Sequence, residues 1–571
     1  MQKEFNKSSP IIDVCVIGSG AGGAPIAYEL AMQGYKVVVL EKGPFLNEKD
    51  FFKDEISVSR RHYFTPNLKD EQHVISTYDG DKIEKTTSNE SNWNFWNGSL
   101  VGGSSNLMSG FFHRMKPNDF KLKSVFGEIE GANSVDWPIS YEDLEPYYDK
   151  VEKVIGVSGK IVPHSFLEQR SSKDFPFEST WEHPVSKWFD SACDKLDFAS
   201  IPTPRAVLPY DALQRSGCSY SNFCGSYGCA TGAKSHARSA LIDKAIKKDC
   251  TVLADSFVYK LEHNEQNEIV KAYYYDKDKN SQVIEAKIFV VAGQAFESSR
   301  LLLNSKSKNF PNGLGNNFNQ VGKNIIFSAG GSGEGTFEFD HLNDTQQQEL
   351  MIRGAFINRS LQDWYEYKDS IFSDTLTKGG TIDFLFEHAN PIAMALSQVY
   401  DGFNDLVWGE ELQTKLRDKF TKSRVLTFEV FNDWLPTDKC FVSVSDDVRD
   451  KWGIPVGDIH LYGHPHDIKV GEYLAKKSVK VLEAMGATNI SYGISDAPPP
   501  NLVAGGCRFG NDEKSSVLDV NCKMHALKNL YVSDASFMPT GGSVPYTWTI
   551  YANSFRIADK IIEKLKSEKL S

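Results

Sequence analysis

The 571-residue sequence lacks an excess of positive charge, long apolar runs and the pattern of a secretory signal. Its formal net charge is −12, which argues against nucleic acid as a partner because phosphates need a basic face. No apolar run reaches the roughly 18–20 residues that cross a bilayer, so we expect no transmembrane helix of its own. The first residues show neither a charged-then-apolar signal nor a twin arginine, so any export is expected to depend on a partner.

Cysteine is also scarce, and most of it is scattered. The chain has nine cysteines, and an odd number in a long chain argues against a disulfide scaffold. The scattered ones have the pattern of small buried apolar residues. Only Cys218, Cys224 and Cys229 are clustered, in the glycine-containing run GCSYSNFCGSYGCATGAK of residues 217–234. These three are the candidates for metal or redox chemistry.

The N-terminal segment has the order strand, glycine turn, helix and strand. Residues 11–17 are almost wholly apolar and β-branched, which predicts a buried parallel strand. A helical pattern follows from Ala24 to Gln33, and Lys36–Leu40 predicts a second buried strand. Because 571 residues are too many for one core, further domains are expected after this unit.

The turn between the first strand and the helix has the glycine pattern of a dinucleotide site. Gly18 is expected to make the tight turn, Gly20 to let the backbone approach a pyrophosphate, and Gly23 to let the helix pack on the strand. The free N–H groups at the start of the helix would face the phosphates. Glu41, at the tip of the second strand, can accept hydrogen bonds from ribose hydroxyls, and it disfavours the 2′-phosphate of NADP.

Later elements are less sharply indicated. Ser140, with Asp143 three residues later, predicts a capped helix start. Residues 250–297 alternate as a hairpin does and end in a strand at Ile288–Val291. Residues 330–490 carry aromatic strands without a phosphate-binding pattern, which suits a substrate domain. The other expected elements are an amphipathic helix at 470–486, a strand at Asn529–Val532 and a final helix from about Thr547.

Four motifs together resemble those of the glucose–methanol–choline (GMC) oxidoreductases, large FAD-dependent enzymes that oxidise alcohols and sugars. They are GSGAGG with Glu41, LVGGSSNLMSGFFHRMKPNDF (100–120), AGQAFESSRLLLNS (292–305), and GGCRFGNDEKSSVLD, KNLYVSDASFMPTGG and TIYANSFRIAD within 505–559. Within the family the chain is most similar to the flavoprotein subunits of bacterial gluconate, fructose or sorbitol dehydrogenases, as DFKLKSVFG and DWPISYEDLEPYYDKVE indicate.

The resemblance implies a mixed α/β and α+β fold. In it a Rossmann-like FAD-binding domain is interleaved with a substrate domain built on an antiparallel sheet. The implied FAD-binding parts are 1–150, 206–330 with the cysteine cluster, and 496–571, and the implied substrate parts are 151–205 and 331–495.

The resemblance also implies which residues hold FAD. In some relatives a histidine in the window 104–108 binds the flavin covalently, whereas the window here reads SSNLM, so non-covalent FAD is expected. By position, Gly18, Gly20, Gly23 and Glu41 would hold the ADP half, Gly102, Gly103 and Ser104 would lie along the flavin, Val258 would contact adenine, and Asp534 with Ala535 would meet the pyrophosphate and ribityl chain.

The sequence departs from the family at the positions of the catalytic residues. Family members remove the proton of the alcohol with a histidine five residues before the Cys or Thr of a GTCRMG-like stretch. Here that stretch is GGCRFG, and Leu502 stands five before Cys507. The second position, usually His or Asn, aligns with Pro545. Because neither Leu502 nor Pro545 can take a proton, the catalytic residues are left unknown.

Three explanations stay open. The alignment can be off by a residue or two, although no histidine lies between residues 467 and 524. A histidine from elsewhere can serve instead. Alternatively the protein binds FAD with altered chemistry or only carries electrons. The histidines considered are His113, His388, His464 and His466, each of which is also typical of a surface or core residue.

The cysteine cluster has four possible uses. It can form a disulfide with one thiol left over, bind zinc, carry free structural thiols, or ligate an iron–sulfur cluster. Zinc usually takes four ligands in close CxxC-type pairs, which the C-x5-C-x4-C spacing with His236 nearby fits poorly. An iron–sulfur cluster needs thiolates on glycine-rich backbone, which the segment supplies.

The resemblance favours the iron–sulfur interpretation. Related dehydrogenase subunits carry a cysteine group directly before GAK, which in some of them ligates a 3Fe–4S cluster, and CATGAK stands here at 229–234. Some relatives have a further cysteine where this chain has Ser221, and the last cysteine spacing differs by one residue. Cys218, Cys224 and Cys229 are therefore the expected ligands of a cluster with one vacant corner.

These features predict an FAD-dependent dehydrogenase of the gluconate 2-dehydrogenase type that oxidises a hydroxyl of a sugar acid, sugar or polyol. Electrons would pass through the iron–sulfur cluster to a cytochrome or quinone partner. The resemblance further implies a small signal-bearing subunit and a periplasmic location, free or on the inner membrane, with the cytoplasm as the alternative. The alternative function is an FAD-binding subunit with altered or no alcohol-oxidising chemistry.

Overall fold

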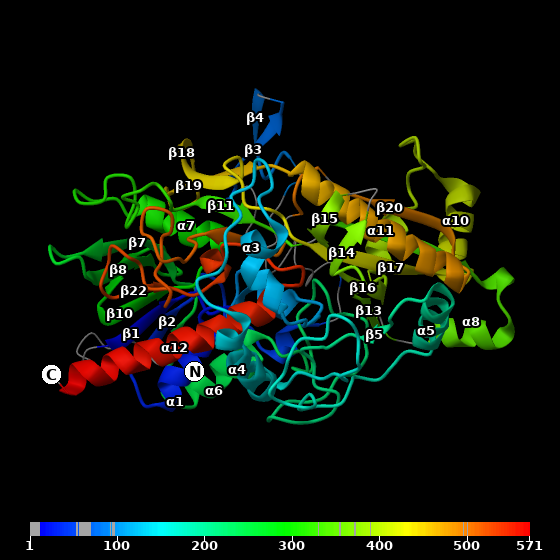
Figure 1. Cartoon of the computed structure of the whole chain (residues 1–571), viewed down its shortest axis with the longest axis horizontal. Helices are drawn as coiled ribbons and strands as arrows, with labels where there is room; N and C mark the ends of the chain where they lie inside the picture. The colour runs from blue at the N-terminus through cyan, green and yellow to red at the C-terminus, as the bar shows by residue number, and fades with distance from the viewer. Residues whose placement is uncertain are drawn as a thin grey trace.

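A five-stranded parallel sheet carries the N-terminal motif in the computed structural model (Figure 1). Its order is β22-β10-β1-β2-β6, so the first strand lies between strands from much later in the chain. The strands are β1 (Ile12–Ile17), β2 (Val37–Leu40), β6 (Thr251–Leu253), β10 (Ala286–Val291) and β22 (Leu530–Val532). The helices α1 (Ala24–Met32), α4 (Tyr141–Val151) and α12 (Thr547–Leu570) pack against one another beside it.

The structure describes most of the chain. The described residues are 12–52, 55, 70–80, 82–91, 93, 98–328, 330–352, 354, 356–369, 373–388, 390–494, 496–499 and 501–570.

The predicted order of strand, helix and strand is confirmed within the described residues. The first expected residue, Ile11, lies outside them. The capped start of α4 is also confirmed, because Ser140 Oγ accepts a hydrogen bond from the backbone of Asp143 and the Asp143 carboxylate accepts one from the backbone of Ser140, at 2.8 Å. Such a reciprocal cap satisfies two N–H groups that a helix start would otherwise leave unpaired.

The hairpin predicted over residues 250–297 is only partly right. Its first and last strands, β6 and β10, belong to the parallel sheet. The antiparallel part is a three-stranded sheet of β7 (Phe257–His263), β8 (Ile269–Tyr275) and β9 (Ser281–Ile284). The strand pairing is interrupted between β6 and β7 at Asp255, whose φ of 52° lies outside the extended range of a regular strand.

A six-stranded antiparallel sheet forms the second large unit, in the order β20-β12-β17-β16-β13-β5. Its strands are β5 (Ile201–Pro202), β12 (Gly331–Glu338), β13 (Phe356–Leu361), β16 (Gly380–Phe386), β17 (Ser423–Asn432) and β20 (Thr488–Gly493). The helix α11 (Pro465–Met485) packs on this sheet and on α5 (Val185–Leu196). The predicted helix at 470–486 therefore exists but begins at Pro465. Together the two units confirm the mixed α/β fold with a Rossmann-like part and an antiparallel sheet.

The remaining elements connect and flank these sheets. A four-stranded sheet in the order β18-β19-β3-β4 stands at the top of the molecule in Figure 1. The bounds are η1 (Glu48–Asp50), β3 (Val74–Asp79), β4 (Lys82–Thr87), η3 (Gly103–Leu107), η4 (Pro117–Lys121), α3 (Leu122–Phe126), η5 (Glu152–Gly156), η6 (Arg238–Ile242), α6 (Asp243–Ile246), α7 (Ala295–Asn304), β11 (Lys323–Ile326), η7 (Phe339–His341), α8 (Asp344–Met351), β14 (Glu366–Asp369), β15 (Ser373–Lys378), α9 (Pro391–Leu396), α10 (Gly409–Thr421), β18 (Phe441–Arg449), β19 (Pro455–Leu461), β21 (Ala504–Gly506) and η8 (Ala535–Phe537).

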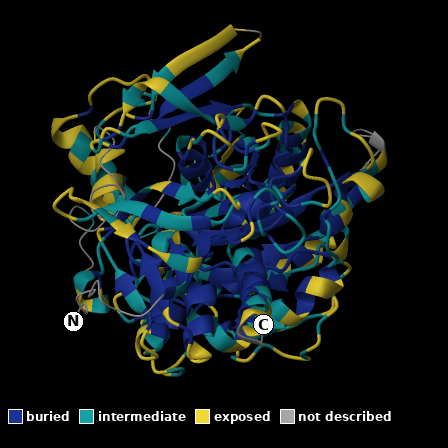
Figure 2. Cartoon of the chain, turned by 90° about the vertical axis from the view of Figure 1, so that its left-hand side faces the viewer, coloured by how far each residue is buried: buried dark blue, intermediate teal, exposed yellow. Residues whose placement is uncertain are grey.

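Buried residues fill the interior of both units, and the exposed ones lie at the periphery (Figure 2). One core spans the parallel sheet with α1, α4 and α12, and a second lies between the antiparallel sheet, α5 and α11. None of the helices in the described part of the chain is long and apolar enough to cross a membrane.

A buried ion-pair network ties α4 to the segment before it. Arg114 is 1% exposed. Its guanidinium donates to Glu145 at 2.9 Å and, through Nε, to Glu152 at 3.0 Å. The Arg114 group also lies near the rings of Tyr148 and Trp548, at 5.5 and 5.4 Å. Two carboxylates in the interior thus share the Arg114 guanidinium.

We expect the stability of the protein to fall between pH 6.5 and about 4, partly because of His183. This buried ring pairs Nε2 with the carbonyl of Ile352 at 3.1 Å and accepts the N–H of Val185 at Nδ1. Burial lowers the pKa of His183 to about 4. Below pH 6.5 the unfolded chain therefore binds the proton more strongly, which costs up to about 3 kcal/mol. The check is urea denaturation from pH 8 to 4.

A variant pair separates His183 from the other histidines. His183→Gln should be less stable at pH 8 and lose less stability on acidification. His341→Gln, at an exposed histidine, should keep the wild-type pH profile. An unchanged profile in His183→Gln would contradict the assignment.

Candidate active site

A cavity of about 550 Å³ brings most of the predicted FAD residues together with residues of the antiparallel sheet. This volume is in the range of cofactor and ligand sites. Gly23 and Gly102 are outside the lining and pack behind it. The predicted residues that line the cavity are Gly18, Gly20, Glu41, Gly103, Ser104, Val258, Asp534 and Ala535.

Two glycines of the first turn, Gly18 and Gly23, leave no room for a side chain. Gly18 has a φ of 101°, and a Cβ there would lie 2.2 Å from the carbonyl oxygen of Ala292. A Cβ on Gly23 would lie 2.0 Å from the carbonyl oxygen of Gly18. Residues 19–22 before α1 line the cavity, as expected for backbone that contacts a pyrophosphate.

Glu41 is held in place at the end of β2. Its Oε2 accepts hydrogen bonds from the backbone and hydroxyl of Ser19, at 3.0 and 2.6 Å, and its Oε1 accepts one from Gly43 at 3.0 Å. Burial raises the pKa of Glu41, and the Ser19 and Gly43 hydrogen bonds act against that rise. The carboxylate is thus oriented at the cavity wall, where ribose hydroxyls are expected.

Asp534, from the C-terminal part of the chain, lines the same end of the cavity as Glu41. Its carboxylate accepts hydrogen bonds from the backbone of Gln294 and of Ser536, both at 2.9 Å, and burial raises its pKa. A Cβ on Gly22 would lie 2.7 Å from the backbone of Asp534. The loop after β22 therefore lies directly against the glycine turn.

Gly102 and Gly103 lie directly against the glycine turn that precedes α1. The backbone of Gly102 donates to Ser19 Oγ at 2.9 Å, and a Cβ on Gly103 would lie 3.0 Å from the Cα of Gly20. Ser104 Oγ accepts a hydrogen bond from Gly98 at 2.9 Å. The backbone of the two glycine segments lines the cavity on two sides, and the Glu41 carboxylate is held at one end. This arrangement fits an extended dinucleotide such as FAD.

The far end of the cavity, called the distal end below, contains Leu502 and Pro545. Leu502 has a φ of 50°, which is unusual for a leucine, and it packs on the cluster of Phe111, Leu385 and Phe431. The two family positions thus line the cavity, and they contribute only apolar surface there.

The four candidate histidines occupy different environments. His113 is buried, with Nε2 3.1 Å from both carboxylate oxygens of Asp383. His464 caps α11 by accepting the N–H of His466, and it contacts the carbonyl of Glu130. His466 faces another cavity. Among the described lining residues, His388 is the candidate histidine at the distal end.

Comparisons with known proteins agree with this site. The GMC oxidoreductase models match residues 177–327 and 436–554, and the FAD dependent oxidoreductase model matches residues 13–50. The chain belongs to the GMC oxidoreductases. It is 26% identical to 2-methyl-1,2-propanediol dehydrogenase of Mycolicibacterium austroafricanum, over 96% of this chain and 95% of that protein. It is 27% identical to the fructose dehydrogenase large subunit of Gluconobacter japonicus, over 97% and 98%.

Solved structures agree on the fold. Formate oxidase of Aspergillus oryzae RIB40 superposes with a TM-score of 0.63 over 98% of this chain and 100% of that one, at 14% identity. Family, cavity and glycine turn together identify an FAD-dependent oxidoreductase.

The distal end of this GMC oxidoreductase also contains Glu429, which the sequence did not single out. It lies on β17 two residues before Phe431, so both side chains are on the same face of the strand. Alternation along a strand can be seen in the sequence, but which face meets the cavity depends on the fold.

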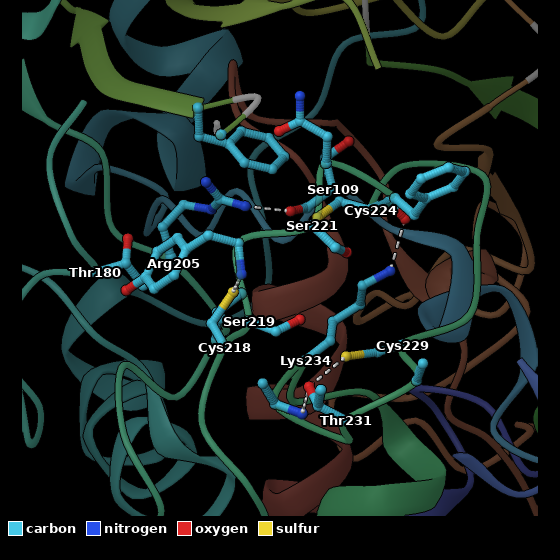
Figure 3. Close-up of a pocket in the computed structure, with 18 of the residues that line it drawn as sticks. Ser109, Thr180, Arg205, Cys218, Ser219, Ser221, Cys224, Cys229, Thr231 and Lys234 are labelled. Atoms are coloured by element: carbon cyan, nitrogen blue, oxygen red, sulfur yellow. Dashed lines mark hydrogen bonds between the residues drawn. The ribbon is translucent and has the colours of Figure 1, made fainter. Parts of the chain in front are cut away.

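The three cysteines surround a smaller cavity of about 60 Å³ (Figure 3). All three are reduced and partly buried. No group of three His, Cys, Asp or Glu side chains in the described residues is arranged to hold a single metal ion. Thiolates of an iron–sulfur cluster bind different iron atoms, so they stand farther apart than the ligands of one ion. Cys218, Cys224 and Cys229 thus share a cavity without forming a mononuclear site.

Two buried cations flank the cysteine cavity. Arg205 donates to the carbonyl of Ser109 at 2.6 Å, and Lys234 donates to the carbonyl of Cys224 at 2.8 Å. Burial raises the pKa of Cys218 to about 11. Burial acts in the same sense on Cys229, but the Lys234 charge and hydrogen bonds outweigh it and bring the pKa of Cys229 below its ordinary value. The site therefore favours the thiolate at Cys229, whereas burial favours the neutral thiol at Cys218.

Proposed function

We propose that this protein is a dehydrogenase that oxidises a hydroxyl group of a neutral sugar or polyol and passes the electrons through an iron–sulfur cluster to a partner acceptor. FAD, when bound, supplies the primary acceptor of the two electrons. The chain's own part is to bind the hydroxyl compound at the distal end, exclude water and take up the hydroxyl proton. FAD is proposed to be non-covalent, so denaturation with acid should release all of it.

One observation carries the proposal: the two cavities share a wall. Ser109 lines both of them. Cys224 lines the cysteine cavity, while its neighbours Gly225 and Ser226 line the large one. A redox group held by the cysteines would therefore be adjacent to the distal end, which suits electron transfer out of a flavin and is unnecessary for a direct oxidase.

The charges at the distal end favour a neutral substrate over a sugar acid. The described residues there include Glu429 and His388, whereas the lysine that lines the cavity, Lys42, follows Glu41 at the opposite end. A carboxylate substrate usually meets an arginine or lysine, and Glu429 would repel it. Polyols and neutral sugars are thus proposed in place of gluconate.

The test is anaerobic mixing of the purified protein with 2-methyl-1,2-propanediol, fructose, sorbitol, glucose and gluconate. Bleaching of the flavin absorption by a neutral compound supports the proposal. Faster bleaching by gluconate would overturn the substrate class. Bleaching by dithionite alone would favour the second candidate, a subunit without alcohol-oxidising chemistry, to which the apolar Leu502 and Pro545 point.

For the cluster, we expect Cys224→Ser to lower iron and acid-labile sulfide while FAD stays bound. Three thiolates are the fewest that hold such a cluster, so loss of one should remove most of the iron. The measurement is iron and sulfide per flavin after anaerobic purification. Cys250→Ala, at a buried cysteine outside the cavity, is the control and should keep the wild-type content. Wild-type protein without iron after reconstitution would refute the cluster.

The partner is proposed to be a cytochrome or quinone-linked protein, with a small signal-bearing subunit and a periplasmic location. Exposed apolar residues beside the cysteine cavity support docking there. Phe52 lines that cavity and is 55% exposed. Glu55 accepts backbone hydrogen bonds from Ile392, which is 40% exposed, and from its neighbour Ala393.

A further inference from the structure

Oxidation of a hydroxyl group needs a proton acceptor, and the two positions that supply it in GMC oxidoreductases are Leu502 and Pro545 here. Building on the proposed function, we propose that the carboxylate of Glu429 takes the hydroxyl proton. The base is thereby moved from the C-terminal segment to a strand of the antiparallel sheet. Leu502 and Pro545 give the distal end an apolar wall, and Glu429 adds a carboxylate to the same end of the cavity.

The geometry of β17 carries this assignment. Glu429 and Phe431 alternate toward the same face and both line the large cavity. Phe431 belongs to the cluster against which Leu502 packs. Glu429 is thus two residues along the strand from a ring of the cluster on which Leu502, at the position of the missing histidine, packs. Unlike Glu41, Glu297 and Asp534, which line the nucleotide end, it faces the distal end.

The strand next to β17 holds a second carboxylate. Asp383 on β16 is directly opposite Glu429 in the antiparallel register. It is completely buried, and His113 and Ser360 donate to it, at 3.1 and 2.5 Å. Asp383 is therefore occupied by protein donors, and it is not among the described residues that line the cavity. This divides the roles: Asp383 with His113 is structural support, and Glu429 faces the substrate.

His388 is the competing group. A Cβ on Gly225 would lie 2.4 Å from His388 Nε2 and 2.7 Å from Ser109 Oγ. The ring also contacts Phe356, with centroids 6.0 Å apart. His388 thus lies at the wall shared with the cysteine cavity. We place it beside the substrate without the role of base.

Tyr546 also lines the distal end, but it is unsuited to accept a proton. Its hydroxyl donates to the carbonyl of Phe327, and burial raises the pKa of Tyr546 well above its ordinary value. It therefore stays a neutral phenol.

The proposed step balances with oxidised FAD as the electron acceptor. The O–H bond breaks and its proton goes to Glu429. The C–H bond breaks and its hydrogen leaves with the electron pair to FAD, while the C–O single bond becomes C=O. Glu429 then returns its proton to water, and the two electrons leave FAD for the acceptor.

The experiment compares Glu429→Gln and His388→Gln with wild type, using the best neutral compound of the substrate panel. The rate of anaerobic flavin reduction should fall about 10²–10⁴-fold in Glu429→Gln, the range of a lost general base, and much less in His388→Gln. The wild-type rate should fall at acid pH as the carboxylate is protonated, and this fall should be missing in Glu429→Gln. Glu334→Gln, at an exposed glutamate of the neighbouring strand β12, is the matched control.

Two further readouts separate a base from a structural residue. Acetate should restore part of the reduction rate in Glu429→Ala. Independently of turnover, the oxidised wild type should bind n-propylammonium more tightly than n-propanol, seen as a change in the flavin spectrum, and Glu429→Gln should lose this preference. FAD content and dithionite reduction should be unchanged in all variants.

The outcomes are distinct. Retention of more than about a third of the wild-type rate in Glu429→Gln, or a 10²-fold loss in His388→Gln alone, overturns the proposal. If wild type is reduced by no compound, the proposed function fails by itself. The ammonium preference then decides for Glu429: its loss in Glu429→Gln supports a carboxylate at the substrate, and equal binding in both proteins overturns it.

Discussion

Gly18→Ala is expected to abolish FAD binding in the purified protein. The residue has a φ of 101°, and the new Cβ would lie 2.2 Å from the carbonyl oxygen of Ala292. Backbone strain alone costs about 1–3 kcal/mol, and a loss of about 3 kcal/mol at the site weakens binding about 100-fold. Since Ala292 directly follows β10, the clash also pushes two neighbouring strands apart. The ratio of flavin to protein absorbance measures the effect.

Gly34→Ala is the matched control, because Gly34 ends α1 of the same unit. It also has a positive φ, 79°, but no atom lies within 4 Å of the new Cβ. We expect a stability loss of about 1 kcal/mol from the left-handed backbone and a full complement of FAD. Stoichiometric FAD in Gly18→Ala, or equal FAD loss in both variants, would refute the role of the tight turn.

Arg114→Met is expected to destabilise the protein by about 3–5 kcal/mol, the range for breaking a buried ion pair. Glu145 loses its cation, and Glu152 retains only Arg170, which donates to it at 2.6 and 2.7 Å. The carboxylates are in the interior beside α12, so water cannot readily replace the guanidinium. Urea denaturation followed by tryptophan fluorescence measures the change.

Two comparisons test this mechanism. Lys153→Met breaks an ion pair with Asp149 in which the lysine is 59% exposed, and it should cost at most about 1 kcal/mol. Adding Glu152→Gln to Arg114→Met should recover part of the loss, because one uncompensated charge disappears. An Arg114→Met protein as stable as Lys153→Met would show that the network contributes little.

Local patterns in the sequence were sufficient for the local parts of the fold. Gly18, Gly23 and Glu41 lie within one strand–helix–strand unit, where spacing alone fixes geometry. Ser140 and Asp143 likewise meet across one helical turn. The prediction for α11 began too late, because its first turn carries Pro465 and His464 as start signals before the apolar period becomes visible.

The rest depends on contacts between distant residues, which no local pattern contains. Glu429 reaches the cavity wall only because β17 pairs with β16 in one register, and a shift by one residue would point it to the other face. Ser109 lines both the large cavity and the cysteine cavity because the segments that contain Ser109 and Cys224 lie side by side. Asp255 interrupts a stretch that alternates like one strand, so β6 and β7 join different sheets.

The strand order β22-β10-β1-β2-β6 has a consequence for the order of synthesis. The two ends of this sheet come from residues 251–253 and 530–532. The ribosome adds about 5–20 residues per second, so roughly half a minute to two minutes pass between the synthesis of the first strand and that of β22, the last strand of the sheet. During that time the glycine turn exists without Asp534 against it. We therefore expect FAD loading to follow translation.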